Sequence, residues 1–156
     1  MNGMSTIVKT VTRWVIGFIL LVGLWLVAYG HLSPGGGFPG GVVIAAGFIL
    51  LMLAHGGRSA GKVFPRPLAR VLDSVGAMAF LLLALVGLWI GGEFFRNTVH
   101  GANPGERLHQ VFNGGLIPFA NLAIAVKVSM SFVVAFGVLA ACRLRAGGEF
   151  DSEEEE

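Results

Sequence analysis

The sequence predicts an all-α integral membrane protein with four transmembrane helices. Only 13% of its 156 residues are charged and 54% are hydrophobic, whereas about 25% of a soluble domain is charged. The apolar residues form four long runs, and about 20 helical residues cross a hydrocarbon core of about 30 Å. These runs do not alternate apolar with polar residues, as a transmembrane β-barrel would require. We place the spans at about residues 14–30, 38–55, 73–92 and 115–142, in one transmembrane domain over residues 10–143.

The first span can also be read as a secretory signal, because Lys9 and Arg13 precede it and small residues lie near Gly30. Its length and its two tryptophans, Trp14 and Trp25, argue against that alternative. We therefore expect it to stay in the protein as a membrane-spanning helix.

The third span repeats part of the first. Residues 21–26 read LVGLWL and residues 85–90 read LVGLWI, so five of six positions match. Both copies lead through a glycine-bearing loop into a second apolar helix, which is the pattern of a helical hairpin duplicated in parallel orientation. Chance similarity in a chain rich in leucine, glycine and valine is the alternative.

Basic residues predict the orientation in the membrane. Lysine and arginine in short loops favour the cytoplasmic side. If both termini and the middle loop are cytoplasmic, eight of the eleven basic residues lie inside and two outside, with Lys127 within the last span. We therefore expect cytoplasmic termini and contact with anionic lipid, and no nucleic-acid-binding face. The acidic residues of 144–156 predict a disordered cytoplasmic tail.

A glycine-proline segment between the first two spans is the most distinctive part of the sequence. It comprises Ser33, Pro34, Gly35, Gly36, Gly37, Phe38, Gly40 and Gly41. Its composition argues against a regular helix, and residues 40–54 alone would reach only about 22 Å. We therefore expect part of the segment to enter the membrane, where it would pack against protein or line a wet cavity. Of these, we favour close packing or contact with a neighbouring subunit.

Lys127 is the main candidate for an ion path, because it lies near the middle of the last span. A charge at the centre of a membrane helix costs about 2.5–3.5 kcal/mol, so such a residue faces protein or a hydrated cavity. Two interpretations stay open, a proton carrier and a lysine that pairs with a carboxylate from another chain. We expect no central carboxylate in this chain, since Asp73 is placed at the start of the third span, where an acidic residue is favourable.

The other ion-path candidates are Asn121, Glu93 and His31. Asn121 and Ser131 are close to Lys127 in sequence and also suit ordinary interhelical hydrogen bonds. Glu93 ends the third span and suits a cation entrance or a solvated loop end. The histidines lack the spacing of a zinc or haem site, and no catalytic constellation is found. We expect no metal, no cofactor and no enzymatic activity.

The segment from Ser33 to Gly41 resembles the hallmark of the B subunit of multisubunit Mrp-type (Mnh) sodium/proton antiporters. Asn113-Gly114-Gly115, with Asn121 and Lys127 after it, is similar to the same family's domain, and the resemblance covers residues 10–143. It does not extend to the acidic tail.

The resemblance implies a small membrane subunit of a hetero-oligomeric antiporter that exchanges sodium ions for protons. Its implied partners are large antiporter-like subunits, which carry the main proton-transfer residues, and other small membrane subunits. The implied location is the bacterial or archaeal cell membrane. Related domains occur in membrane-bound hydrogenases, so a structural subunit of a hydrogenase or related respiratory complex is the alternative.

Overall fold

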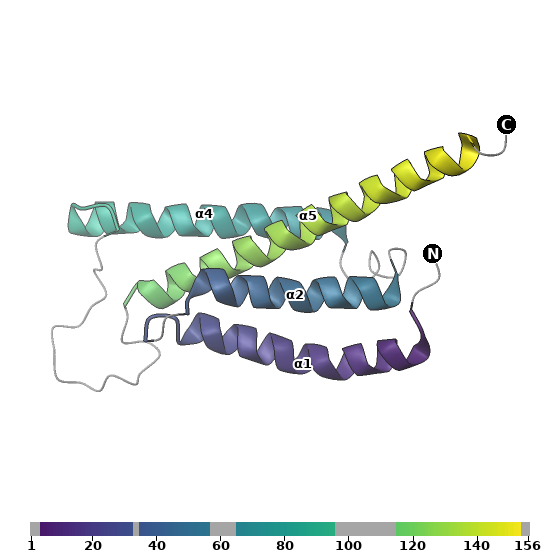
Figure 1. The fold of residues 1–156 in the computed structure, drawn as a ribbon. Helices are drawn as coiled ribbons and strands as arrows, with labels where there is room; N and C mark the ends of the chain where they lie inside the picture. Colours follow the sequence, from purple (N-terminus) through teal and green to yellow (C-terminus); the bar gives the residue numbers. More distant parts are fainter. Residues whose placement is uncertain (1–3, 33–34, 57–64, 96–114, 154–156) are drawn as a thin grey trace.

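Four long helices run through residues 4–32, 35–56, 65–95 and 115–153, the parts of the chain that the computed structural model describes. They are α1 (Thr6–Ala28), α2 (Gly37–His55), α4 (Arg66–Gly91) and α5 (Ile117–Glu153) (Figure 1). Each contains a stretch long and apolar enough to cross a membrane. The predicted all-α fold of four membrane helices is confirmed, while the orientation of the termini and the hairpin duplication stay predictions.

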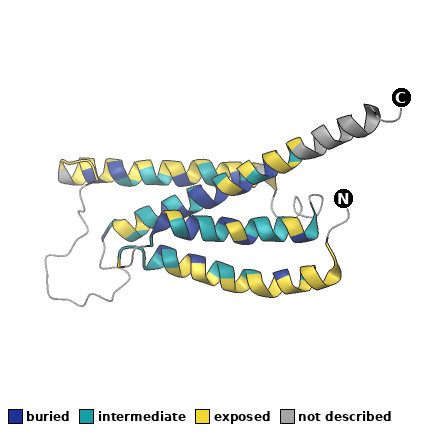
Figure 2. Ribbon diagram, viewed as in Figure 1, coloured by how far each residue is buried: buried dark blue, intermediate teal, exposed yellow. Residues whose placement is uncertain are grey.

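The helices are arranged in the order α1, α2, α5, α4. α2 packs against α1 on one side and α5 on the other, and α4 packs against α5 (Figure 1). No large side chain of the described residues is fully buried, and exposed residues dominate α1 and recur along α4 (Figure 2). The four helices therefore leave a wide apolar surface for lipid or for other subunits.

Glycines set the close approach of α2 to its neighbours. A Cβ atom on Gly40 would lie 2.5 Å from Val27 Cγ2, and one on Gly41 would lie 2.9 Å from the carbonyl oxygen of Ala125. Larger residues would push α1 or α5 away, because small residues are what lets membrane helices pack backbone to backbone. These glycines make their close contacts within this chain.

The first turn of α2 corrects the prediction that the glycine-proline segment is non-helical. The helix begins at Gly37, and the Gly40 amide donates a hydrogen bond to the Gly36 carbonyl at 3.2 Å. Pro39 is tolerated because first-turn amides have no acceptor within the helix. The resulting 19 residues extend about 28 Å, so no irregular backbone is needed to complete the span. Gly36 has φ of 131°, a conformation that favours glycine; residues 33–34 lie outside the described residues.

Three helix ends differ from the predicted ones. α1 begins at Thr6, α4 begins at Arg66, and α5 continues to Glu153. The predicted boundaries followed the apolar runs, whereas a helix continues into polar residues until a breaker stops it. Pro67 in the first turn suits the start of α4. Residues 144–153 therefore have helical backbone where a disordered tail was expected, and residues 154–156 lie outside the described residues.

Candidate functional site

Lys127 of α5 and Asp73 of α4 form an ion pair. The Lys127 Nζ atom lies 3.3 Å from Asp73 Oδ1. Ser131 joins them, because its hydroxyl accepts a hydrogen bond from Lys127 Nζ at 2.8 Å and donates one to Asp73 Oδ1 at 2.5 Å. The three side chains, here called the charged cluster, therefore form a closed triangle of charge-assisted contacts.

The charged cluster corrects the expectation that Lys127 has no carboxylate partner in its own chain. Asp73 does not begin a helix, because α4 starts at Arg66. It lies about 9 Å along the helix from Pro67, where the apolar span begins. Lys127 lies about 15 Å from Ile117, the first residue of the α5 span. Both charged groups are thus inside membrane-spanning segments.

Gly76 explains why these two side chains meet. A Cβ atom on Gly76 would lie 2.8 Å from the Lys127 amide nitrogen and 3.0 Å from the Ala123 carbonyl oxygen. The two antiparallel helices therefore touch backbone to backbone at this level. Asp73 is three residues before Gly76 and Ser131 is four after Lys127, so each lies on the contact side of its helix, one turn along.

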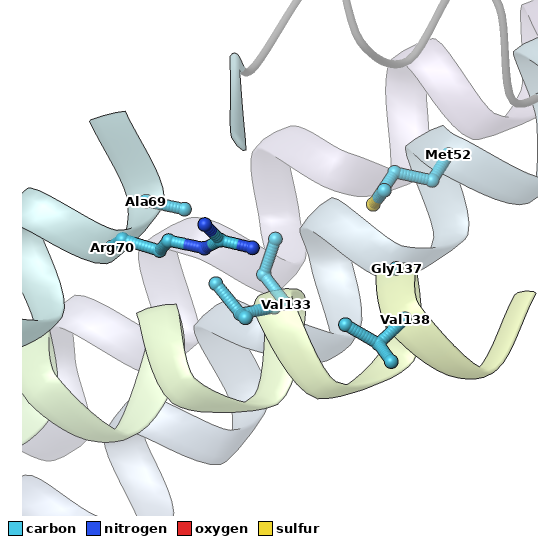
Figure 3. A pocket seen from close by; sticks show the side chains of 7 residues that line it. Met52, Ala69, Arg70, Val133, Gly137 and Val138 are labelled. Carbon is cyan, nitrogen blue, oxygen red and sulfur yellow. The ribbon is translucent and has the colours of Figure 1, made fainter. Parts of the chain in front are cut away.

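The charged cluster lies beside a groove. A cavity of about 50 Å³ is lined by Met52 of α2, Arg70 of α4, and Val133, Val134 and Val138 of α5 (Figure 3). α2 and α4 thus form the walls of this groove and α5 forms its floor.

Helical spacing places the groove one turn from the charged cluster. Arg70 precedes Asp73 by three residues and Val134 follows Ser131 by three, so each pair shares a helix face. In Figure 3 the Arg70 side chain extends from α4 toward Val133. The groove therefore lies about one helical turn from the charged cluster, on the side toward the start of α4.

The charged cluster is partly open. The side chain of Lys127 is 44% exposed and that of Asp73 is 34% exposed. Charges at this depth are unfavourable against lipid, so they face a bundle interior, another protein or a water-filled cavity. The partial exposure of the pair therefore favours contact of this side of α4 and α5 with another protein or with water.

Asn121 and His31 lie apart from the charged cluster. The Asn121 Nδ2 atom reaches the turn after α1, where it would lie 2.9 Å from a Cβ atom on Gly30. This atom and both ring nitrogens of His31 are buried and have no hydrogen-bond partner among the described residues. Asn121 is also about 9 Å along α5 from Lys127 and on a different side of the helix. The structure therefore does not bring these two ion-path candidates to Lys127.

Glu93 lies at the far end of α4 from Asp73. It follows Gly92, the left-handed residue that ends the helix, and its side chain is exposed. It is not part of the charged cluster. The described residues also contain no group of three or more histidine, cysteine, aspartate or glutamate side chains that could hold a metal ion.

Sequence reasoning missed Asp73 as a member of this site, and it named Ser131 only as a neighbour of Lys127 that also suits ordinary interhelical hydrogen bonds. Two signals pointed to them. Ser131 stands four residues after Lys127, which puts both on one helix face. Pro65 and Pro67 mark a helix start well before Asp73, which would have placed the carboxylate inside the span.

Comparisons with known proteins give a consistent assignment. Residues 7–143 match the family described as a domain related to the MnhB subunit of Na+/H+ antiporters. The chain is 36% identical over 114 residues to an uncharacterized protein of Methanocaldococcus jannaschii, a match that covers 70% of this chain and 43% of the relative. It is 34% identical over 94 residues to a protein of Staphylococcus saprophyticus that is named as a proposed antiporter subunit, mnhB2. This match covers 60% of this chain and 66% of the relative.

A solved structure shares the fold. The match is to a chain of the membrane-bound sulfane sulfur reductase, an archaeal respiratory membrane complex, with a TM-score of 0.71 and 30% identity. It covers 88% of this chain and 61% of the other. The chain thus spans less than half of the Methanocaldococcus relative and about two thirds of the others.

Proposed function

The chain belongs to the family of domains related to the MnhB subunit of Na+/H+ antiporters, and we propose that it is a membrane subunit of a multisubunit cation/proton antiporter. Its transported ions would be Na+ and H+. Its partners would be the large antiporter-like subunits and other small membrane subunits. It would serve assembly of the complex and contribute to an ion path, without enzymatic activity of its own.

The charged cluster is the observation that supports this proposal best. Charged side chains within a membrane span are energetically unfavourable against lipid. Ionisable residues that occur there therefore commonly line ion or proton pathways. A cluster of ammonium, hydroxyl and carboxylate groups can exchange a proton or hold a monovalent cation. The partial exposure of the pair supports access from water or from a neighbouring subunit.

The wide apolar surface supports a place inside a larger complex. Trp89 of α4 and Ile7 of α1 are 95% and 76% exposed, and these helices occupy the two ends of the row. Helices of other subunits or lipid must cover such a surface. His31, Asn121 and Glu93 remain proposed contributors to an ion path, separate from the charged cluster.

A structural subunit of a respiratory complex is the second candidate. The similarity to a chain of the sulfane sulfur reductase complex favours it. In that role the charged cluster would fix the contact of α4 with α5 and need not exchange ions.

Purification of the tagged chain from its native membrane is the test that separates the two functions. We expect large antiporter-like subunits and other small membrane subunits to copurify in fixed proportion, identified by mass spectrometry. Subunits that bind redox centres would support the respiratory alternative. Recovery of the chain only as a homo-oligomer, under conditions that preserve other membrane complexes of the same cells, would contradict both.

A further inference from the structure

We propose that the groove between α2 and α4 binds one anionic phospholipid, with the lipid phosphate held by Arg70 and the upper part of an acyl chain lying on α5. This inference goes beyond the proposed function. It assigns a lipid site that the chain would carry in either kind of complex.

Arg70 supplies a positive charge that is available to an anion. Its side chain is exposed, and within the described part of the chain its guanidinium forms no ion pair. Asp73, the next charged residue along α4, is already paired with Lys127. In Figure 3 the Arg70 side chain extends from α4 over the groove toward Val133. A guanidinium binds phosphate oxygens through a fork of N–H donors, so Arg70 suits the phosphate of a lipid.

The depth of Arg70 in the membrane matches that of a lipid headgroup. Arg70 lies three residues after Pro67, where the span of α4 begins, which is about 4–5 Å along the helix. An arginine this close to the end of a span reaches the polar interface with its long side chain. Basic pockets between membrane helices on this kind of boundary bind anionic headgroups.

The groove beside Arg70 is apolar and has free space. Met52 of α2 and Val138 of α5 line it about 4–6 Å inside the ends of their spans, so it lies at the depth of the first acyl methylene groups. A Cβ atom on Gly137, in the floor, would lie 3.9 Å from Met52 Cε, an ordinary van der Waals distance. The floor therefore has room for atoms that this chain does not supply, and an acyl chain matches its apolar lining.

The groove suits a lipid better than a helix from another subunit. The cavity measures about 50 Å³, whereas a helix with its side chains is about 10–12 Å across. α2 and α4 each pack on α5 and barely contact one another, so a thin flexible chain can lie between them. A partner helix would also have to bring a carboxylate to offset the charge of Arg70, whereas an anionic lipid already carries one negative charge.

The test measures lipid binding to the purified full-length chain in neutral detergent. Native mass spectrometry counts the bound lipids during titration with dioleoylphosphatidylglycerol. Dioleoylphosphatidylcholine, which has the same acyl chains and no net charge, is the control lipid. We expect one phosphatidylglycerol to bind at least about fivefold more tightly than phosphatidylcholine, and to raise the melting temperature of the chain.

Variants of Arg70 test the headgroup contact. Arg70→Gln should lose the preference for phosphatidylglycerol, and Arg70→Lys should keep part of it, because the charge remains without the fork of donors. Arg13→Gln is the matched control. It removes one exposed positive charge from the same end of the bundle, on α1 at the other side of the helix row (Figure 1), and it should bind both lipids like the wild type.

Gly137→Leu tests the acyl-chain contact. The new side chain would fill the floor of the groove and leave the charge of Arg70 in place, so both lipids should bind at least about fivefold more weakly. A melting temperature without added lipid that equals that of the wild type would show that each variant is folded.

Three results would overturn the lipid site. They are equal affinity of the wild type for the two lipids, a preference for phosphatidylglycerol that survives in Arg70→Gln, and unchanged binding in Gly137→Leu. In the complex purified from native membranes, loss of another subunit from the Gly137→Leu variant with unchanged lipid content would overturn it too, because a helix would then occupy the groove. None of these results depends on ion exchange, so the lipid site and the proposed function can fail separately.

Discussion

Replacing Asp73 with asparagine should destabilise the protein markedly, because Lys127 then remains charged in a membrane span without a carboxylate. Removing one partner of a fully buried pair costs about 3–5 kcal/mol. Here the side chains are 44% and 34% exposed, so solvent screening reduces the expected loss to about 1–3 kcal/mol. Thermal unfolding of the purified chain in detergent should show a lower melting temperature.

The double variant Asp73→Asn/Lys127→Met is the control for that loss. Because it removes the unpaired charge, it should recover most of the lost melting temperature, as expected for two residues in direct contact. If the single and double variants melted at the same reduced temperature, the two charges would not be coupled and the ion pair would have no stabilising role.

Gly76→Val should have the second large effect, because it separates α4 from α5. The new Cβ would lie 2.8 Å from the Lys127 amide nitrogen and 3.0 Å from the Ala123 carbonyl oxygen. These are backbone atoms, which cannot turn aside as a flexible side chain would. Among the described helices α4 packs chiefly against α5, so this contact is the main one that holds it in place. We expect a loss of about 3 kcal/mol and a lower yield of folded protein from membranes.

Ala77→Val is the matched control for this clash. It adds a β-branched side chain to the same turn of α4, at a residue whose side chain is exposed. Its melting temperature should stay close to that of the wild type. Equal melting temperatures for the Gly76 and Ala77 variants would show that close contact at Gly76 is unimportant.

The fold was predictable from the sequence because lipid restricts the choices. A long apolar run without alternation can cross a bilayer only as a helix. The four runs in this sequence correspond to α1, α2, α4 and α5. The helix ends were less predictable. Hydropathy identifies only the part of a helix that lies in hydrocarbon. The predicted starts of α1 and α4 therefore left out their polar first turns, which begin at Thr6 and Arg66.

The candidate site was predictable only in part, and for a different reason. Lys127 was identifiable as one charge within an apolar run. Its pairing with Asp73 depends on how far α4 is shifted along α5, which Gly76 sets through a contact between residues 51 positions apart. Nothing in the local pattern around Asp73 specifies that shift. Because the sequence analysis started this helix at residue 73, seven residues later than the observed start at Arg66, it placed the Asp73 carboxylate at the helix end and not inside the span.

The most direct test of the central claim is sodium-driven proton movement in inverted membrane vesicles from cells whose complex carries Lys127→Met. Lys127→Met leaves the Asp73 carboxylate without its ion-pair partner, whereas Asp73→Asn/Lys127→Met removes both charges, so both variants are compared with the wild type. The account predicts that exchange per assembled complex falls about tenfold or more in each variant, while the double variant assembles at the wild-type level. Wild-type exchange with normal assembly would contradict a role of the charged cluster in ion transport.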